Sequence, residues 1–276
     1  MEIRNSVALL VACVSCCAAS ASPILTTFEA TGSTVASITP TVDAFRTAIG
    51  GGTTAGANGS FGGERREINW DGVPDAQADP NLLPADFFNV TSPRGVEFAT
   101  SGTGFLVSAN AGSVEPTLFG FPNDFQTFSA QRLFTAVNSN TTDVLFFEPG
   151  TNTAATTTAF GLIFVDVEVA GMTNISFFDS DGVLIYSRNA LVGGNQGLSF
   201  VGATVTGGAI SRVRITAGSN TIVSNGVLGN PNDDIVVMDD FIYAEPTAAV
   251  TTVPEPATLA LLGAGLALVT VVRRRR

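Results

Sequence analysis

Residues 22–246 contain short apolar runs that alternate with polar positions and are separated by clusters of Gly, Asn, Asp, Ser and Thr. A two-residue period is typical of strands with one buried face, and the clusters are typical of turns. In the clearest run, residues 160–169, Val165 and Val167 should point to one side of a strand and Asp166 to the other. Further strands are predicted at residues 173–178, 183–187, 198–205, 210–216 and 234–243.

The spacing of these predicted strands indicates the fold class. An Asp-Ser-Asp-Gly segment at residues 179–182 predicts a hairpin turn, because glycine adopts positive φ without steric cost. Before the C-terminal tail, only residues 41–49 show helical periodicity. Strands without intervening helices favour an antiparallel sandwich. We therefore expect an all-β sandwich over residues 22–246, with a loop at 50–63. Residues 151–158 are expected to form a similar loop, with a continued strand as the alternative.

The first 21 residues have the pattern of a secretory signal peptide. Arg4 supplies a positive charge, residues 7–14 are apolar, and the small residues Ala19 and Ala21 stand at the cleavage positions. All three cysteines lie in this segment, so the remaining chain must fold without disulfides or thiolate ligands. A lipid-modified cysteine is the alternative, although the residues before these cysteines make a poor lipid-attachment motif.

The last 24 residues, 253–276, form a three-part segment that follows a linker at residues 247–252. The apolar part has 16 residues, which as a helix would span about 24 Å, short of the ~30 Å hydrocarbon core. Terminal arginines can reach the headgroups and favour the cytoplasmic side. The segment predicts a single short transmembrane helix with the body outside the cytoplasm. Its parts are Val253, Pro254, Glu255 and Pro256, the apolar run 257–272, and Arg273, Arg274, Arg275 and Arg276.

This order of a Val-Pro-Glu-Pro motif, a short apolar helix and an arginine cluster resembles the PEP-CTERM sorting signal of Gram-negative bacteria. The resemblance implies recognition by an exosortase, a membrane-embedded cysteine transpeptidase. Such an enzyme would cleave near the motif and hand the body to the cell surface or its polysaccharide matrix. In the body, residues 65–75 and 82–95 resemble segments of an uncharacterised family of such proteins, and this likeness transfers no catalytic residue.

The charge balance and the missing residue types argue against several classes of function. The chain has 13 basic and 24 acidic residues, a net charge of −11, and its basic residues are all arginine. Such acidity argues against nucleic-acid binding, which needs basic patches to contact phosphate. Without His or Lys, no Ser-His-Asp or Ser-Lys nucleophile can form. A glycosidase carboxylate pair stays open as an alternative, but no pair stands out, and we expect no enzyme.

Asp239 and Asp240 lie inside an apolar run, where strand alternation predicts that they point to opposite faces. The one that faces the core then needs an arginine, several backbone N–H groups or a metal, because an unpaired buried carboxylate is costly. The Asp-Asp pair in the closing strand, with Glu29 in the opening one, resembles jelly-roll carbohydrate-binding modules. The resemblance implies a jelly-roll-like sandwich in which Glu29, Asp239 and Asp240 hold a structural Ca²⁺.

Residues 65–75 are the most distinctive segment of the body and contain the single tryptophan, Trp70. On one interpretation Trp70 stacks on a sugar, while Asp71 and Asp75 bind its hydroxyls or Ca²⁺. On the other, which we favour, Trp70 lies in the core, Asp71 begins a turn, and Arg65 or Arg66 pairs locally.

The sequence as a whole favours an exported, exosortase-sorted protein of the cell surface or extracellular matrix with a non-catalytic sandwich. Three readings of the body compete: a Ca²⁺-stabilised carbohydrate-binding module, a purely structural matrix protein, and a surface glycosidase. The expected partners are the exosortase, the membrane before processing, and extracellular polysaccharide.

Overall fold

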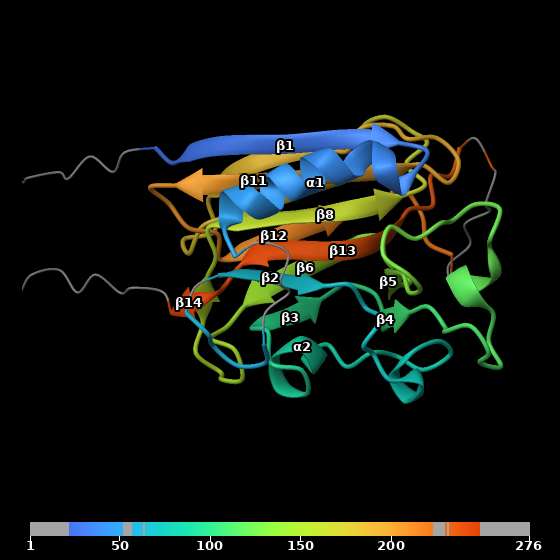
Figure 1. The fold of residues 1–276 in the computed structure, drawn as a ribbon, viewed down its shortest axis with the longest axis horizontal. Helices are drawn as coiled ribbons and strands as arrows, with labels where there is room; N and C mark the ends of the chain where they lie inside the picture. The colour runs from blue at the N-terminus through green and yellow to red at the C-terminus, as the bar shows by residue number, and fades with distance from the viewer. Residues whose placement is uncertain (1–21, 52–56, 63, 223–229, 231, 249–276) are drawn as a thin grey trace, which may run out of the picture.

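The computed structural model describes residues 22–51, 57–62, 64–222, 230 and 232–248. These residues form a β-rich body with few helices (Figure 1). Its elements are β1 (Ile24–Gly32), α1 (Val35–Ile49), β2 (Arg65–Ile68), η1 (Asp75–Gln77), α2 (Phe87–Val90), β3 (Val96–Ala99), β4 (Gly104–Val107), η2 (Thr117–Gly120), β5 (Phe134–Val137), β6 (Thr141–Phe146), β7 (Ala155–Thr156), β8 (Ala159–Val165), β9 (Asn174–Phe178), β10 (Leu184–Asn189), β11 (Leu198–Thr206), β12 (Arg212–Thr216), β13 (Val237–Ala244) and β14 (Thr247–Ala248).

Two antiparallel sheets make up most of the body, which confirms the predicted all-β class. The seven-stranded sheet has the order β1-β11-β8-β13-β5-β4, with β2 also paired to β13. The five-stranded sheet has the order β10-β9-β12-β6-β3. Because β11 and β8 lie between β1 and β13, the opening and closing strands are not neighbours. The jelly-roll-like expectation that a shared ion ties these two strands together is therefore wrong.

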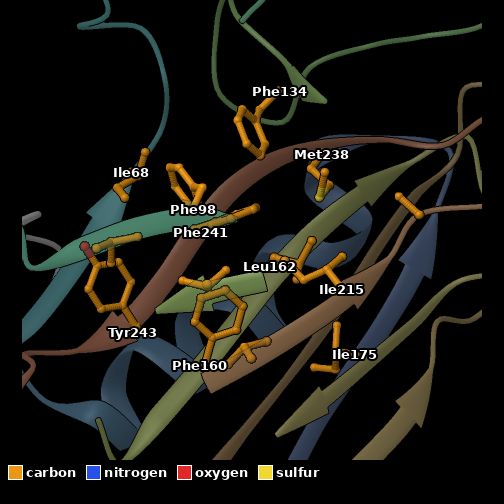
Figure 2. Packing of buried hydrophobic residues seen from close by; sticks show 14 of the residues in the cluster. Ile68, Phe98, Phe134, Phe160, Leu162, Ile175, Ile215, Met238, Phe241 and Tyr243 are labelled. Carbon is orange, nitrogen blue, oxygen red and sulfur yellow. The ribbon is translucent and has the colours of Figure 1, made fainter. Parts of the chain in front are cut away.

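The main core lies between the two sheets. Figure 2 shows Phe98 and Ile215 of the five-stranded sheet among Phe160, Leu162 and Phe241 of the seven-stranded sheet. Four of these side chains are fully buried, and Phe98 is nearly so. Alternation within β9 and β12 sends one set of apolar side chains inward, as their buried-exposed pattern predicts.

A second core lies on the opposite face of the seven-stranded sheet, which helix α1 covers (Figure 1). Ile38, Val42 and Phe45 follow a helical spacing and are fully buried against this face. The expected helix, residues 41–49, is therefore too short. The observed helix begins at Val35, so that Pro40 lies inside it.

Contact between α1 and the sheet depends on two facing glycines. Gly161 of β8 and Gly202 of β11 are paired in register. A Cβ atom on Gly202 would lie 3.0 Å from the Phe200 ring, 3.1 Å from Gly161 Cα and 3.2 Å from the Phe45 ring. The pair leaves a notch that the Phe45 ring fills, so that the helix can pack close to the strands.

One predicted strand ends earlier than expected. All seven residues of β8 are buried, because one face meets the main core between the sheets and the other meets the second core, to which α1 contributes. The predicted strand at residues 160–169 ends at Val165, and Asp166 leaves it in a left-handed conformation with φ 74°. Asp166 is itself buried, which corrects its expected position on an exposed face.

The hairpin between β9 and β10 is confirmed. Gly182 has φ 77°, and the Asp179 side chain accepts the N–H groups of Asp181 and Val183, both at 2.9 Å. The proposed threonine-rich loop at 151–158 contains the short strand β7, which pairs with β14. The folded body thus continues to Ala248, two residues into the predicted 247–252 linker.

A buried ion pair holds the chain in place just after β13. Arg66 and Glu245, both buried, form an ion pair with a distance of 3.0 Å between Nη2 and Oε2. The other oxygen of Glu245 accepts the Ser60 hydroxyl at 2.7 Å and the Phe61 N–H at 2.8 Å. Figure 1 places β14 and the beginning of β1 at the same end of the molecule.

Candidate functional site

Asp239 and Asp240 sit in a β-bulge of β13 and form a buried acid pair. Met238 pairs with Phe164 of β8 and Phe241 pairs with Leu162, so the two aspartates stand opposite the single residue Ile163. The prediction that they point to opposite faces is wrong, because the extra residue breaks the alternation.

Both carboxyl groups meet the same hydroxyl group. Ser129 Oγ lies 3.2 Å from Oδ1 of Asp239 and 2.6 Å from Oδ1 of Asp240. Oδ2 of Asp239 accepts the backbone N–H of Phe128 at 2.6 Å. Burial, and then the neighbouring Asp240 charge, hold the pKa of Asp239 well above its usual range, and burial raises the pKa of Asp240 as well. The acid pair is therefore arranged to retain a proton to higher pH than exposed aspartates do.

An arginine network lies beside the acid pair and joins α1 to the sheet. Arg46, in the last turn of α1, donates through Nε and Nη2 to both oxygens of Glu67 on β2, at 2.8 and 2.9 Å. Arg65 contacts the same carboxylate at 2.6 Å, and Arg46 lies 3.7 Å from Asp240. The carboxylate of Glu67 is therefore occupied by structural ion pairs, and the arrangement fixes the helix end rather than presenting a reactive group.

Trp70 is part of the core, which confirms the structural interpretation and rules out a sugar-stacking surface. Its side chain is 1% exposed and stacks on Phe134 with the ring centroids 4.1 Å apart. The indole N–H donates to the carbonyl oxygen of Asp239 at 3.0 Å. The predicted turn follows it, since the Val73 N–H bonds to the Trp70 carbonyl at 2.9 Å.

Asp71 and Asp75 brace the segment before β5. Asp71 accepts the backbone N–H groups of Gln131 at 2.5 Å and Arg132 at 3.2 Å. Asp75 pairs with the guanidinium of Arg132, whose side chain is buried. The structure therefore gives both carboxylates internal partners, in place of the hydroxyls or cation of the sugar-binding interpretation.

Glu29 is remote from the acid pair, so the proposed calcium site does not form. The seven-stranded sheet interposes β11 and β8 between Glu29 on β1 and Asp239 on β13. Glu29 instead receives Nε and Nη2 of Arg188 at 2.6 and 2.7 Å. Among the residues that the structure describes, no group of three or more His, Cys, Asp or Glu could hold a metal ion.

The Glu29–Arg188 pair instead forms part of an open groove of about 610 Å³ where the edge strands β1 and β10 meet. Asparagine and serine side chains dominate its polar wall. Asn174 donates to Ser187 at 3.1 Å and to Asn189 at 2.9 Å. This edge groove is lined by Glu29, Ala170, Gly171, Asn174, Ser187, Arg188, Asn189, Ala190, Leu191 and Val192.

Sequence reasoning did not identify the edge groove. Strand β10 mixes apolar and polar residues without clear alternation, and only the folded sheets bring it next to β1. Glu29 and Arg188 are 159 positions apart in the sequence, so no local sequence pattern predicts their bidentate ion pair.

The predicted processing segments fall outside the described residues. This holds for Ala19 and Ala21, for Val253, Pro254, Glu255 and Pro256, for the apolar run, and for Arg273, Arg274, Arg275 and Arg276. Within the described ranges, the structure contains no helix that is long and apolar enough to cross a membrane.

Comparison with known families decides how the C-terminal segment is interpreted. The family model of the PEP-CTERM protein-sorting motif matches residues 252–276. The chain carries a PEP-CTERM sorting motif. The motif indicates an exported protein that an exosortase targets and whose C-terminus is anchored in the membrane before processing. No curated protein matches the chain.

Proposed function

We propose that this PEP-CTERM protein is a non-catalytic component of the cell surface or extracellular matrix, released from the inner membrane after exosortase processing. The observation that carries the proposal is the sorting motif at residues 252–276 directly after a folded body. Removal of the signal peptide after Ala21 and cleavage near Pro254 would leave the sandwich as the mature protein.

The short distance between body and motif supports this proposal. The last described strand ends at Ala248, and six Cα–Cα steps separate it from Pro254. A fully extended chain of that length spans at most about 22 Å. The body must therefore lie close to the membrane-embedded enzyme during processing. The end that carries both β14 and the beginning of β1 would face the membrane.

A non-catalytic role is supported by the partners that acidic side chains of the body have within the fold. Asp239 and Asp240 are buried and bound to Ser129, Glu67 is held by two arginines, and Asp71 is bound to backbone N–H groups. A glycosidase needs two carboxyl groups that flank an accessible substrate. These acids are bound to other groups of the fold, so a structural or binding module is the better account.

The sorting proposal is tested by fractionation of cells that encode an exosortase. We expect the wild-type protein in the surface and matrix fractions. A variant with Pro254→Ala, Glu255→Ala and Pro256→Ala should remain in the membrane fraction. A control outside the matched motif, Thr251→Ala, should behave as the wild type. Equal release of the motif variant and the wild type would contradict the proposal.

A further inference from the structure

We propose that the edge groove is a binding site for a neutral saccharide chain. This inference rests on the proposed function and deepens it, because it gives a surface or matrix protein a ligand class. The groove volume of about 610 Å³ lies within the range of ligand sites in proteins, roughly 300–1,000 Å³. It is open along one side, which suits a segment of a polymer better than an enclosed cofactor.

The polar wall of the groove matches the chemistry of hydroxyl groups. Asn174, Ser187 and Asn189 present amide and hydroxyl groups that both donate and accept hydrogen bonds. Ser187 and Asn189 are exposed, so a ligand can reach their unused positions. A sugar hydroxyl is likewise donor and acceptor, whereas a phosphate only accepts and an ammonium only donates.

The charges in the groove favour a ligand without net charge. Arg188 and Glu29 are its charged lining residues, and they neutralise each other in a bidentate pair at 2.6 and 2.7 Å. An anionic ligand would have to compete with Glu29 for the guanidinium. The pair can still offer hydrogen bonds to a neutral ligand, because Arg188 has a half-exposed side chain.

The other wall is apolar. Leu191 and Val192 are 40% and 44% exposed, and Ala170 and Ala190 lie beside them. Such a wall can cover the C–H face of a sugar ring. An aliphatic wall gives less binding energy per sugar ring than an aromatic one. Affinity should therefore come from contacts with several sugar units of the saccharide chain.

Among macromolecular ligands, a peptide is the main alternative to a saccharide. An extended peptide would add to the edge of β10 through its backbone and would anchor side chains in separate pockets. The lining of the groove instead combines the polar side chains of Asn174, Ser187 and Asn189 with the aliphatic side chains of Leu191 and Val192. This arrangement favours a saccharide chain.

The test is an array of neutral oligosaccharides, with uronic and sulfated oligosaccharides as charged probes. The full chain should be purified in a zwitterionic detergent that has no sugar headgroup. The groove variant is Asn189→Ala with Leu191→Ser, and both parent side chains are exposed. The matched control is Asn81→Ala with Leu82→Ser, which alters an exposed Asn and an exposed Leu outside the groove.

We expect the wild type and the control to bind neutral glycans and the groove variant to bind at least about tenfold more weakly, with an unchanged melting temperature. Preference for the charged probes, no glycan binding, or equal binding by the groove and control variants would overturn the proposal. The array does not depend on processing, so such a result leaves the sorting proposal to its own fractionation test.

Discussion

Asp239 and Asp240 both direct a carboxyl oxygen toward the hydroxyl of Ser129, although they are consecutive residues of one strand. The bulge that allows this places two carboxyl groups in the protein interior, where their charged forms are disfavoured. The same holds for Asp166, since burial, together with nearby acidic charges, raises its pKa to about 7. The folded protein therefore binds protons that the unfolded chain releases at lower pH.

This proton retention predicts how stability depends on pH. A folded-state pKa above the unfolded value gives stability that is complete at low pH and is lost as pH rises through the folded value. For Asp166 the loss extends from about pH 4 to about pH 7. We expect the melting temperature to fall between pH 5 and pH 8, and Asp166→Asn to reduce that fall by several degrees. A steeper fall in the variant would contradict the assignment.

Asp166→Ala is the informative control for this prediction. In the wild type, Oδ1 of Asp166 accepts the Gln196 N–H at 2.8 Å. Asparagine can still accept this hydrogen bond and tolerates the left-handed backbone of residue 166. Alanine offers neither property and should destabilise the protein at all these pH values. Asp239→Asn should reduce the pH dependence in the same direction, because the amide is neutral and can still accept the Phe128 N–H.

The notch at Gly161 and Gly202 predicts a packing defect. Gly202→Val would force atoms into the Phe45 and Phe200 rings, and overpacking of this kind costs about 1–3 kcal/mol. The melting temperature should fall by about 2–12 °C. Gly72→Ala is the control, because a Cβ atom there has no neighbour within 4 Å. Equal effects of the two substitutions would show that α1 does not pack as described.

The buried ion pair between Arg66 and Glu245 predicts a larger loss of stability. Glu245→Gln leaves the Arg66 guanidinium buried without its counter-charge, at a cost of about 3–5 kcal/mol in the free energy of unfolding. A drop in melting temperature on the order of 10 °C should follow. Arg214→Met, which removes a pair to Asp143 with a half-exposed arginine, should cost at most about 1 kcal/mol. A smaller effect at Glu245 than at Arg214 would contradict the described anchor.

Trp70 provides a spectroscopic test of the core. It is the single tryptophan of the chain, so the intrinsic tryptophan emission reports one environment. Because its side chain is 1% exposed, we expect blue-shifted emission that acrylamide quenches weakly and that saccharides leave unchanged. Emission typical of a solvated indole, or a shift on addition of saccharide, would contradict the core position of Trp70 and support sugar stacking on it.

The sequence allowed prediction of the local features of this fold. Short β-rich runs bounded by turn residues identified β9 to β12, and the glycine at 182 identified the hairpin turn. Alternation failed at Asp239 and Asp240, because a bulge inserts one residue and no local residue type marks it. It also failed after Val165, because both faces of β8 are buried and Asp166 leaves the strand in a left-handed conformation.

The candidate sites depended even more on long-range pairing. Trp70 lies in the core because β2 joins β13 and brings the indole onto Phe134. Glu29 was assigned to a metal on the assumption that the first and last strands are adjacent, and the sheet order places two strands between them. Strand order follows from the packing of both sheets, which short-range patterns do not specify.

The most direct test of the central claim is the intact mass of the protein released to the surface of a cell that encodes an exosortase. We expect a mature chain that begins at Ser22 and ends near Pro254, without the apolar run or Arg273, Arg274, Arg275 and Arg276. A released chain that still carries these arginines would contradict processing at the PEP-CTERM motif.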